Sequence, residues 1–365
     1  MVEWKKLGEV CETITPPKKL TKENYLEKGL YPIIDQGQSN VVGYTDDEST
    51  LLENNEYVLF GDHTRYVKYF KGNFAQGADG LKILRAKKSI NTKYFYYTFQ
   101  NTEVPSRGYS RHWSIAKDIL IPIPSLEEQE RIVGILDTFT ASIDNIKAQI
   151  EQRRKQYEHY RNTLLTFNKD DDSVEWKTLE DIFELRNGYT PSKANSEFWT
   201  DGTIPWFRME DIRDKGRILS DSYLHITESA IKGKGLFKAN SFILATTATI
   251  GEHALLIADS LANQQFTNLK IRKSLINNID IKFMFYYMFV VDEFCKSHTN
   301  VSGFASVDMN ALKRMAIPIP TLARQQEIVS ILDTFEASIT NLEAQLEQRQ
   351  KQYEYYREEL LTNLS

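Results

Sequence analysis

The feature that most constrains this chain is an internal repeat. Residues 121–139 read IPIPSLEEQERIVGILDTF, and residues 317–335 read IPIPTLARQQEIVSILDTF. Aligned at an offset of 196, residues 121–165 and 317–361 are identical at 30 of 45 positions. Because such self-similarity marks a duplicated structural unit, the chain is predicted to consist of two variable blocks that alternate with two near-identical segments.

Weaker similarities support this division. VEWKKLGEV at 2–10 and VEWKTLEDI at 174–182 open the two halves, and IPIP closes both variable blocks. The segment NKDDDS is polar and acidic, as expected of a linker. We therefore expect a first block at 1–120, a repeated helix at 121–167, an acidic linker at 168–173, a second block at 174–316 and a C-terminal repeated helix at 317–365.

Each repeated segment is predicted to form one long helix with a coiled-coil seam. Its seam residues recur in steps of four and three without a slip, and such a 3.5-residue period is typical of paired helices. A helix of about 40 residues would span roughly 60 Å. The first seam is Ile132, Leu136, Phe139, Ile143, Ile146, Ile150, Arg153, Tyr157, Tyr160 and Leu164, and the second is Ile328, Leu332, Phe335, Ile339, Leu342, Leu346, Arg349, Tyr353, Tyr356 and Leu360.

The nearest packing partner for either seam is the other copy. We expect an antiparallel pair, which would relate the two halves by a pseudo-two-fold axis. The alternative is that each helix lies on its own block or on another protein. Arg153 and Arg349 interrupt the two seams at the same point, where a charged residue more often fixes the register or meets a partner than performs chemistry.

The two helix starts differ. Ser125 and Glu128 have the spacing of a capping box. Thr321 can cap the second helix, but Arg324 stands where the box requires Glu or Gln. Because Ala323-Arg324 replaces the acidic pair of the first copy, the two helix starts are not expected to be interchangeable.

The variable blocks have the pattern of mixed α/β domains. Short β-branched and aromatic runs, among them Glu56–Phe60, Tyr66–Phe70 and Ser241–Ala245, alternate with turns rich in Gly, Asn and Asp. The predicted fold class is therefore α/β (α+β), with two mixed domains joined by two long helices in an antiparallel coiled coil.

Composition indicates an ordinary folded protein. Apolar residues make up 41% of the chain and charged residues 26%, which is enough for real cores. No apolar run is long enough for a membrane helix, and MVEWKKLGEV lacks the core of a signal peptide, so we expect a cytoplasmic protein. Cys11 and Cys295 are too few for a disulfide framework or a zinc site and are expected to be buried.

The net charge of −5 by itself argues against a nucleic-acid binder. The acidic excess, however, lies in the repeated segments. Residues 1–120 hold 17 Lys and Arg against 15 Asp and Glu, and residues 174–316 hold 17 against 17. The pattern of charge, rather than its total, must therefore carry any argument about nucleic acid.

The sequence lacks the common catalytic motifs. It contains no GxxxxGK[ST], HExxH, GxSxG or Asn/Asp-Pro-Pro-aromatic motif, and its six histidines show no metal-ligand spacing. Gly61-Asp62-His63 and Asp79 are compatible with a nuclease, but isolated Asp and His residues in turns are usually surface residues. We expect a duplicated binding protein with no catalytic residues, metal or cofactor of its own.

Basic and aromatic residues gather in turn-rich loops of both blocks. These residue types contact phosphates and base edges. An ordinary solvated loop is the alternative for any single residue, so only the clusters favour DNA. The candidates are Lys18, Lys19, His63, Arg65, Lys68, Arg107, Arg111 and His112 in the first block, and Arg186, Lys193, Arg208, Arg213, Arg217, Lys232 and Lys234 in the second.

Several phrases of the sequence together carry a family resemblance. They are the duplicated IPIP-x-L-x-x-Q-x-x-I-V-x-I-L-D, the Gln-, Arg-, Lys- and Tyr-rich helix behind it, and block phrases such as Asn187–Ser192 and Ile204–Trp206. With these in the order block–helix–block–helix, the chain resembles the specificity subunit of type I restriction–modification systems over essentially its full length.

The resemblance implies a DNA-binding subunit that performs no chemistry itself. Each block would be a target-recognition domain that reads one half of a split double-stranded DNA site. The helices would set the spacer and bind two methyltransferase subunits, and restriction–translocase subunits would join through the complex. S-adenosylmethionine, ATP and Mg²⁺ would belong to those partner subunits, and the target base would leave the stack to reach the methyltransferase pocket.

Two other classes of protein are alternatives. A coiled-coil scaffold whose duplicated α/β blocks bind proteins would have no neighbouring gene for an Asn/Asp-Pro-Pro-aromatic methyltransferase. A self-contained nuclease or methyltransferase is opposed by the missing motifs, and a cofactor-binding assay on the purified chain would distinguish it.

Overall fold

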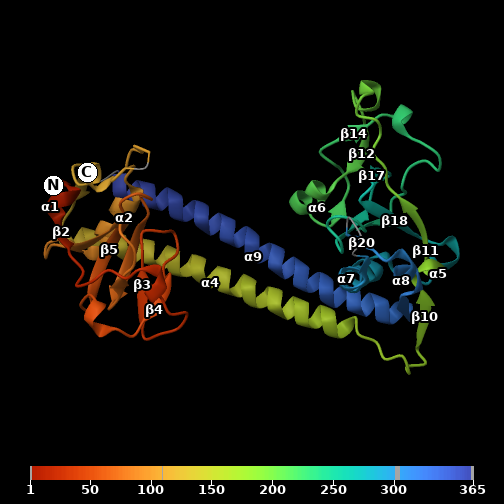
Figure 1. Ribbon diagram of the computed structural model, residues 1–365, viewed down its shortest axis with the longest axis horizontal. Coiled ribbons are helices and arrows are strands. Elements are labelled where there is room, and N and C mark those ends of the chain that lie inside the picture. Colours follow the sequence, from red (N-terminus) through yellow and green to blue (C-terminus); the bar gives the residue numbers. More distant parts are fainter. Residues whose placement is uncertain (1, 109, 301–304, 363–365) are drawn as a thin grey trace. The chain divides into compact units, whose positions relative to one another are not determined.

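The computed structural model describes residues 2–108, 110–300 and 305–362. The chain forms two compact units: Met1–Ile150 with Asn341–Ser365 make the first, and Glu151–Thr340 make the second. Each unit contains one mixed α/β block together with parts of the two long helices, α4 (Leu126–Leu164) and α9 (Leu322–Thr362), as Figure 1 shows.

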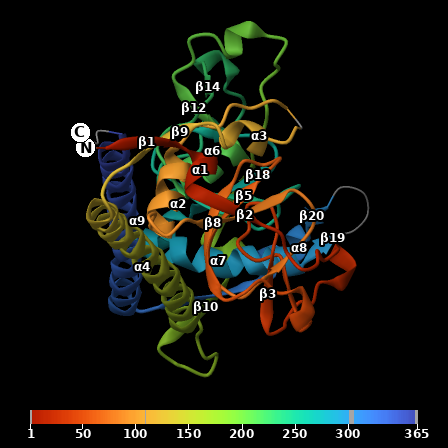
Figure 2. The same ribbon diagram turned by 90° about the vertical axis from the view of Figure 1, so that its left-hand side faces the viewer.

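The block of the first unit is built on an antiparallel four-stranded sheet in the order β2-β8-β5-β6, and a three-stranded sheet has the order β4-β3-β7. Helix α2 lies between the larger sheet and the long helices (Figure 2), where Phe95 and Phe99 share a core with Phe60. The elements are α1 (Leu7–Val10), β2 (Cys11–Ile14), β3 (Tyr31–Ile34), β4 (Gly43–Thr45), β5 (Asn55–Gly61), β6 (Val67–Gly72), β7 (Ala75–Gln76), β8 (Leu81–Ala86), α2 (Thr92–Asn101) and α3 (Trp113–Ala116).

The block of the second unit has the same plan with added elements. Its larger sheet has the order β11-β18-β15-β16-β13, and its smaller sheet the order β14-β12-β17. The elements are α5 (Leu179–Ile182), β11 (Phe183–Asn187), β12 (Ile204–Phe207), α6 (Met209–Lys215), β13 (Ile218–Leu219), β14 (His225–Ile226), β15 (Ser241–Ala245), β16 (His253–Leu256), β17 (Leu261–Ala262), β18 (Phe266–Ile271), α7 (Ile281–Ser297), the paired β19 (Thr299–Asn300) and β20 (Ser306–Val307), and α8 (Met309–Arg314).

The two blocks correspond strand by strand. From strand order and pairing, β2, β8, β5 and β6 match β11, β18, β15 and β16, while α2 matches α7. This shared core extends the duplication into the variable blocks, where the sequences give only faint signs of it.

In each half, the segment that opens the block pairs as a β-strand with the IPIP segment that closes it. Strand β1 (Glu3–Lys6) is antiparallel to β9 (Leu120–Ile123), and β10 (Val174–Thr178) is antiparallel to β21 (Ala316–Pro320). IPIP is therefore a strand, and the helix of each repeat begins only at Leu126 or Leu322. Prolines are tolerated here because each of these sheets has only two strands, so every strand is an edge strand.

The helix starts are capped, and their charge order is reversed. The Glu128 N–H donates to Ser125 Oγ at 3.3 Å, and the Arg324 N–H donates to Thr321 Oγ1 at 3.4 Å. The Glu128 carboxylate binds Arg131 instead of completing the capping box. At the equivalent positions of the second copy, Arg324 binds Glu327. The acidic and basic residues have therefore exchanged places between the two copies, and each copy keeps an ion pair between residues i and i+3.

Within each unit the segments of α4 and α9 pack antiparallel. In the first unit Ile132, near the start of α4, shares a core with Leu361 near the end of α9. In the second unit Leu165, directly after α4, shares a core with Ile328 near the start of α9. Each helix also packs against its own block, so both predicted partners of the seam are present. The seam residues Ile132, Leu136, Ile143, Ile146, Ile150, Ile328 and Leu332 are buried, and Phe139, Tyr157, Phe335, Ile339, Leu342, Leu346 and Tyr353 are half-buried.

The two seam arginines lie over aromatic rings. The Arg349 guanidinium is 5.7 Å from the centre of the Phe139 ring, and the Arg153 guanidinium is 5.8 Å from that of Phe335. Phe139 in turn stacks with Tyr356 at 5.3 Å. A planar cation on a ring face is favourable at a half-buried site, so these arginines continue the seam rather than break it.

Both cysteines are buried and free. Burial raises the pKa of each thiol to about 12, so both stay protonated. Among the described residues, no helix is long and apolar enough to cross a membrane.

Candidate nucleic-acid interface

Hydrogen bonds from His112 and Trp113 to Asp62, called the Asp62 clamp, hold the basic loops of the first block in place. Asp62 is 1% exposed, and its Oδ1 accepts the Trp113 N–H at 2.7 Å. Its carbonyl accepts the backbone N–H of His112 at 2.8 Å and lies 2.9 Å from His112 Nδ1. His112 Nε2 accepts the Arg107 N–H at 3.1 Å, so Nδ1 must carry the proton. The clamp closes the segment that carries Arg107 and Arg111.

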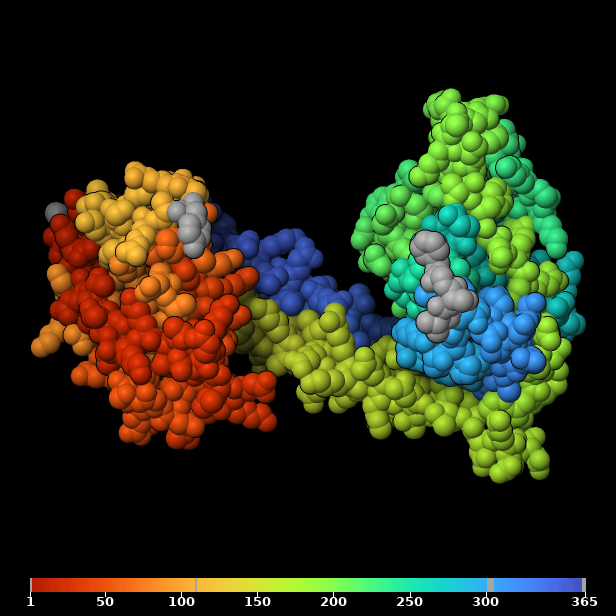
Figure 3. All heavy atoms as spheres, viewed as in Figure 1, coloured from red at the N-terminus to blue at the C-terminus, as the bar shows by residue number. Residues whose placement is uncertain are grey.

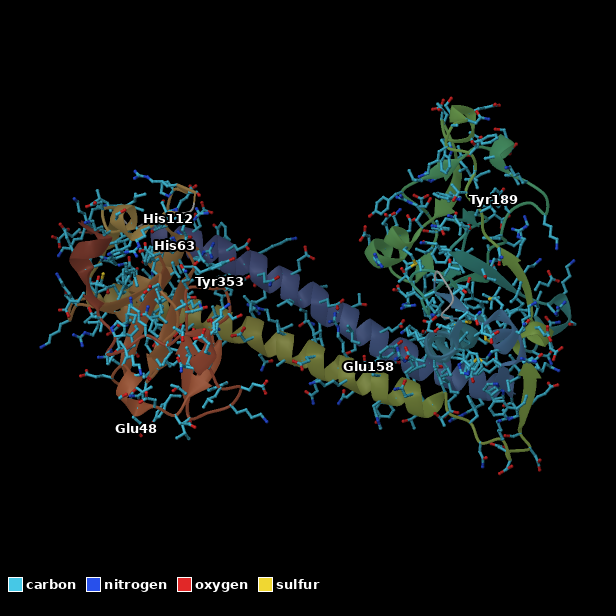
Figure 4. The ribbon with its side chains drawn as sticks, in the orientation of Figure 1. Glu48, His63, His112, Glu158, Tyr189 and Tyr353 are labelled. Carbon is cyan, nitrogen blue, oxygen red and sulfur yellow. The ribbon has the colours of Figure 1, made fainter. Side chains whose placement is uncertain are left out.

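The clamp brings several predicted residues together. His63 follows Asp62 directly, and Figure 4 shows it close to His112. Arg65, at a positive φ of 63°, donates from Nη1 to the Val104 carbonyl at 3.0 Å and so ties the turn after β5 to the same segment. Arg107 and Arg111 are exposed there, whereas Tyr109, between them, lies outside the described residues.

Lys19 and Lys68 are engaged within the block. Lys19 Nζ lies 2.6 Å from Asp79 Oδ1, and this bond holds the pKa of Asp79 below its usual value. Lys68 is 8% exposed and donates to the Asp35 and Ser39 carbonyls, while burial lowers its pKa. Lys18 is exposed.

In the second block, the loop after β11 is pinned to its neighbours. The Tyr189 hydroxyl donates to the Ala230 carbonyl at 3.1 Å and accepts the Lys232 N–H at 2.8 Å. At Gly188 a Cβ would lie 2.2 Å from the Asn263 carbonyl oxygen, so only glycine fits. The segment between β11 and β12, drawn in yellow-green, forms the end of this unit that lies away from α7 and α8 (Figure 1 and Figure 3).

The predicted basic residues of the second block fall into two groups. Lys193, Arg213, Lys232 and Lys234 are exposed. Arg186 lies over the Phe237 ring at 4.4 Å, and burial lowers its pKa; Arg208 pairs with Glu210 at 2.8 Å.

Arg217, whose side chain is 30% exposed, contacts the buried pair Asp292 and His253. Its Nη1 lies 3.3 Å from the Asp292 carboxylate, which accepts a hydrogen bond from His253 Nδ1 at 2.7 Å. His253 is fully buried, and that burial lowers its pKa. Lys68 and His112 are buried and bonded within the fold, which revises the expectation that these two side chains reach DNA directly. For the half-buried Arg217 that expectation stays a prediction.

Each block is anchored to α4 or α9 by the same two contacts. In the first unit Asp137 accepts from Lys93 Nζ at 2.6 Å and from the Tyr97 hydroxyl at 2.7 Å. Burial is the main cause that raises the pKa of Tyr97, which therefore remains a donor. Gln129, 1% exposed, accepts the Asn91 N–H at 2.9 Å and donates to the Pro124 carbonyl at 3.0 Å.

The second unit repeats both contacts. Asp333 accepts from Lys282 Nζ at 2.7 Å and from the Tyr286 hydroxyl at 2.6 Å. Gln325, fully buried, accepts the Asp280 N–H at 2.7 Å and donates to the Pro320 carbonyl at 2.7 Å. Asn91 and Asp280 are themselves the N-caps of α2 and α7.

Sequence reasoning missed these anchors. Gln129 and Gln325, like Asp137 and Asp333, are identical at the offset of 196. The aromatic run of each block also has a Lys and a Tyr four residues apart, Lys93 and Tyr97 or Lys282 and Tyr286. Together, these two regularities could have predicted the contacts between block and helix. Among the described residues no group of three or more His, Cys, Asp or Glu side chains has the arrangement of a metal site.

Comparison with known proteins agrees with this geometry. The family model described as "Type I restriction modification DNA specificity domain" matches residues 1–153 and 172–351. The type I restriction enzyme EcoR124I/EcoR124II specificity subunit of Escherichia coli is 33% identical over 99% of this chain and 94% of its own length. The EcoprrI specificity subunit, also of Escherichia coli, is 50% identical over 52% of this chain and 50% of its own length.

A solved structure shows that the fold is shared. The S subunit of the type I restriction–modification system of M. genitalium superposes with a TM-score of 0.59 at 15% identity, covering 100% of this chain and 97% of that one.

Proposed function

The chain belongs to the family of type I restriction–modification DNA specificity subunits, and from this premise we propose how its two units divide the recognition of DNA. As a specificity subunit it supplies sequence recognition to a complex, and it is not itself an enzyme. Each block reads one half of a split double-stranded target, and the long helices fix the distance between the halves.

The duplicated anchor is the observation that carries this proposal. Two blocks of different sequence are held on near-identical helices through the same Gln and Asp contacts, at Gln129 and Asp137 and again at Gln325 and Asp333. A bipartite target requires two recognition domains of different sequence that are held by the same contacts on a constant helical support. A general protein-binding scaffold does not require two blocks of different sequence that are attached by identical contacts.

The exposed Lys and Arg residues and the half-buried His63 are the proposed DNA contacts, because such side chains reach phosphates and base edges. The clamped and stacked residues hold the loops that carry them. The contact set is Lys18, Lys19, His63, Arg65, Arg107, Arg111, Lys193, Arg213, Lys232 and Lys234, and the positioning set is Lys68, His112, Arg186, Arg208 and Arg217.

The partners proposed are two methyltransferase subunits on the helix pair, with restriction subunits joining through the complex. S-adenosylmethionine, ATP and Mg²⁺ belong to those subunits. The near-neutral blocks, with 17 basic against 15 acidic residues in the first and 17 against 17 in the second, favour modest affinity of the isolated chain for DNA, with partners supplying further phosphate contacts.

The test is DNA binding by the chain assembled with its methyltransferase subunits. Arg107→Ala and Arg111→Ala should each weaken binding, by about 1–3 kcal/mol for a base contact and with a shallower salt dependence for a phosphate contact. Any lost discrimination should fall in one half of the target only. Equal loss in both halves would contradict the assignment of one block to one half-site.

A further inference from the structure

A polar groove of about 650 Å³ opens in the first unit beside β6. Residues of β6, α2, α4 and α9 line it, and several of them are tyrosines. Tyr353, which Figure 4 labels, belongs to the α9 wall. The tyrosines of the lining are Tyr66, Tyr69, Tyr96, Tyr97 and Tyr353.

The outer edge of β6 has no strand beside it in the described part of the chain, because the sheet ends in the order β2-β8-β5-β6. On the side of β6 that faces β5, called inward, the Gly61 N–H donates to the Tyr66 carbonyl at 2.9 Å. Since inward and outward groups alternate along an antiparallel strand, the N–H groups of Tyr69 and Lys71 point outward. The edge is thus a template for a further strand.

In the second unit the corresponding edge is occupied. Strand β13 runs parallel to β16, and the N–H groups of Leu255 and Ile257 donate to the carbonyls of Arg217 and Leu219 at 2.8 and 3.0 Å. By sheet register, Leu255 and Ile257 take the places of Tyr69 and Lys71. The same two outward N–H groups are therefore bonded to a strand in one unit and open in the other.

A side chain fills the space beside this strand in the second unit. The Arg217 guanidinium lies over the ring of Phe289, 5.0 Å from its centre. Counted from the anchor lysines Lys282 and Lys93, Phe289 corresponds to Gln100, which lines the groove of the first unit. The groove is therefore the place that β13 and Arg217 take in the other unit.

We propose that the outer edge of β6 docks an extended segment of a methyltransferase subunit, which adds a fifth strand to the sheet beside this groove. The outward N–H groups recognise the strand's carbonyls. The charges of the groove are mixed, because four basic and three acidic side chains line it: Lys68, Lys93, Lys147 and Arg357, and Asp137, Asp144 and Glu354.

The inference rests on the proposed function, because the partner is a subunit of that complex. Lys71→Pro removes an outward N–H without breaking a bond inside the sheet, since proline is tolerated on an edge strand. Lys71→Ala is the matched control: both variants lose the 3.0 Å ion pair with Glu56, but only the proline loses the N–H. Circular dichroism and thermal midpoints establish that both variants fold.

Hydrogen exchange of the full chain gives a second readout that does not depend on a variant. It is measured for the chain alone, with its methyltransferase subunits, and with target duplex DNA. We expect the amides of residues 66–72 to exchange at least about tenfold more slowly with the protein subunits. Residues 253–257 should be protected already in the free chain. Lys71→Pro should assemble about three- to tenfold more weakly, the effect of one hydrogen bond, whereas Lys71→Ala should assemble as the unaltered chain does.

Two results would overturn the inference. One is unchanged exchange at residues 66–72 in the assembled complex, with Lys71→Pro behaving as Lys71→Ala. The other is protection of these amides by DNA alone, which would make the edge a DNA-facing surface. Assembly and methylation by the unaltered chain, measured on the same samples, test the proposed function separately.

Discussion

Substituting Asp333 tests whether the anchor holds the second block on its helix. Asp333→Ala removes the acceptor of both Lys282 and Tyr286. Asp333 and Lys282 are 37% and 45% exposed, so their ion pair contributes at most about 1 kcal/mol. The Tyr286 hydroxyl is different, because the residue is only 1% exposed and a buried donor left without a partner costs about 1–3 kcal/mol.

The expected loss in the free energy of unfolding is therefore about 1–4 kcal/mol. For a unit the size of Glu151–Thr340, each 1 kcal/mol lowers the midpoint of thermal unfolding by about 2–4 °C. The assay is thermal unfolding followed by circular dichroism, combined with a double-mutant cycle. Tyr286→Phe alone should cost less, about 0.5–1.5 kcal/mol, because the partly exposed Asp333 keeps water and Lys282 as partners.

The double variant should cost clearly less than the sum of the two single changes, since the orphaned hydroxyl is then absent. Asp144→Ala is the matched control: it removes an exposed aspartate on a long helix, and Asp144 forms no ion pair among the described residues. If Asp333→Ala destabilised no more than this control, Asp333 would not hold the second block on its helix. Additivity of the two single changes to within about 0.5 kcal/mol would refute the coupling of Asp333 to Tyr286.

Three further outcomes are expected. Burial lowers the pKa of His253, so the unfolded chain binds its proton at a higher pH than the folded chain; the thermal midpoint should therefore fall as the pH drops below about 6.5, and His253→Gln should flatten that slope. Arg349→Ala should cost about 0.5–1 kcal/mol through the lost contact with Phe139, and Arg349→Met clearly less because its stem still packs; equal costs in urea unfolding would argue against the ring contact. Adding one heptad near Gln149-Ile150, matched in α9, should change the spacer in the methylated target and leave the half-site bases unchanged, as read by long-read methylome sequencing.

The helices and their pairing could be predicted from the sequence because their signal is local. A seam from Ile132 to Leu164 repeats every 3.5 residues, and a helix needs only its near neighbours to form. IPIP was different. Its pairing partner Glu3–Lys6 lies more than 110 residues away, so neither its strand nor the delayed helix start is visible in a short window.

Among the predicted basic residues, too, local patterns could be predicted from the sequence and long-range contacts could not. Lys232 and Lys234 are exposed, as residues in a glycine-rich turn are expected to be. His112 and Lys68 stand among similar polar neighbours in the sequence, but they are buried because Asp62 and the Asp35 carbonyl come to them from distant segments. Burial of a single polar residue depends on long-range packing, which no local pattern records.

The most direct test of the central claim is to replace residues 174–316 with the same block of a relative that has a different target. The graft must keep the cap, lysine and tyrosine that correspond to Asp280, Lys282 and Tyr286, so that the anchor on α9 is preserved. Long-read methylome sequencing of a host expressing the complex should then show one half of the target replaced, with the other half and the spacer unchanged. New bases in both halves, or an altered spacer, would contradict the assignment of one block to each half-site.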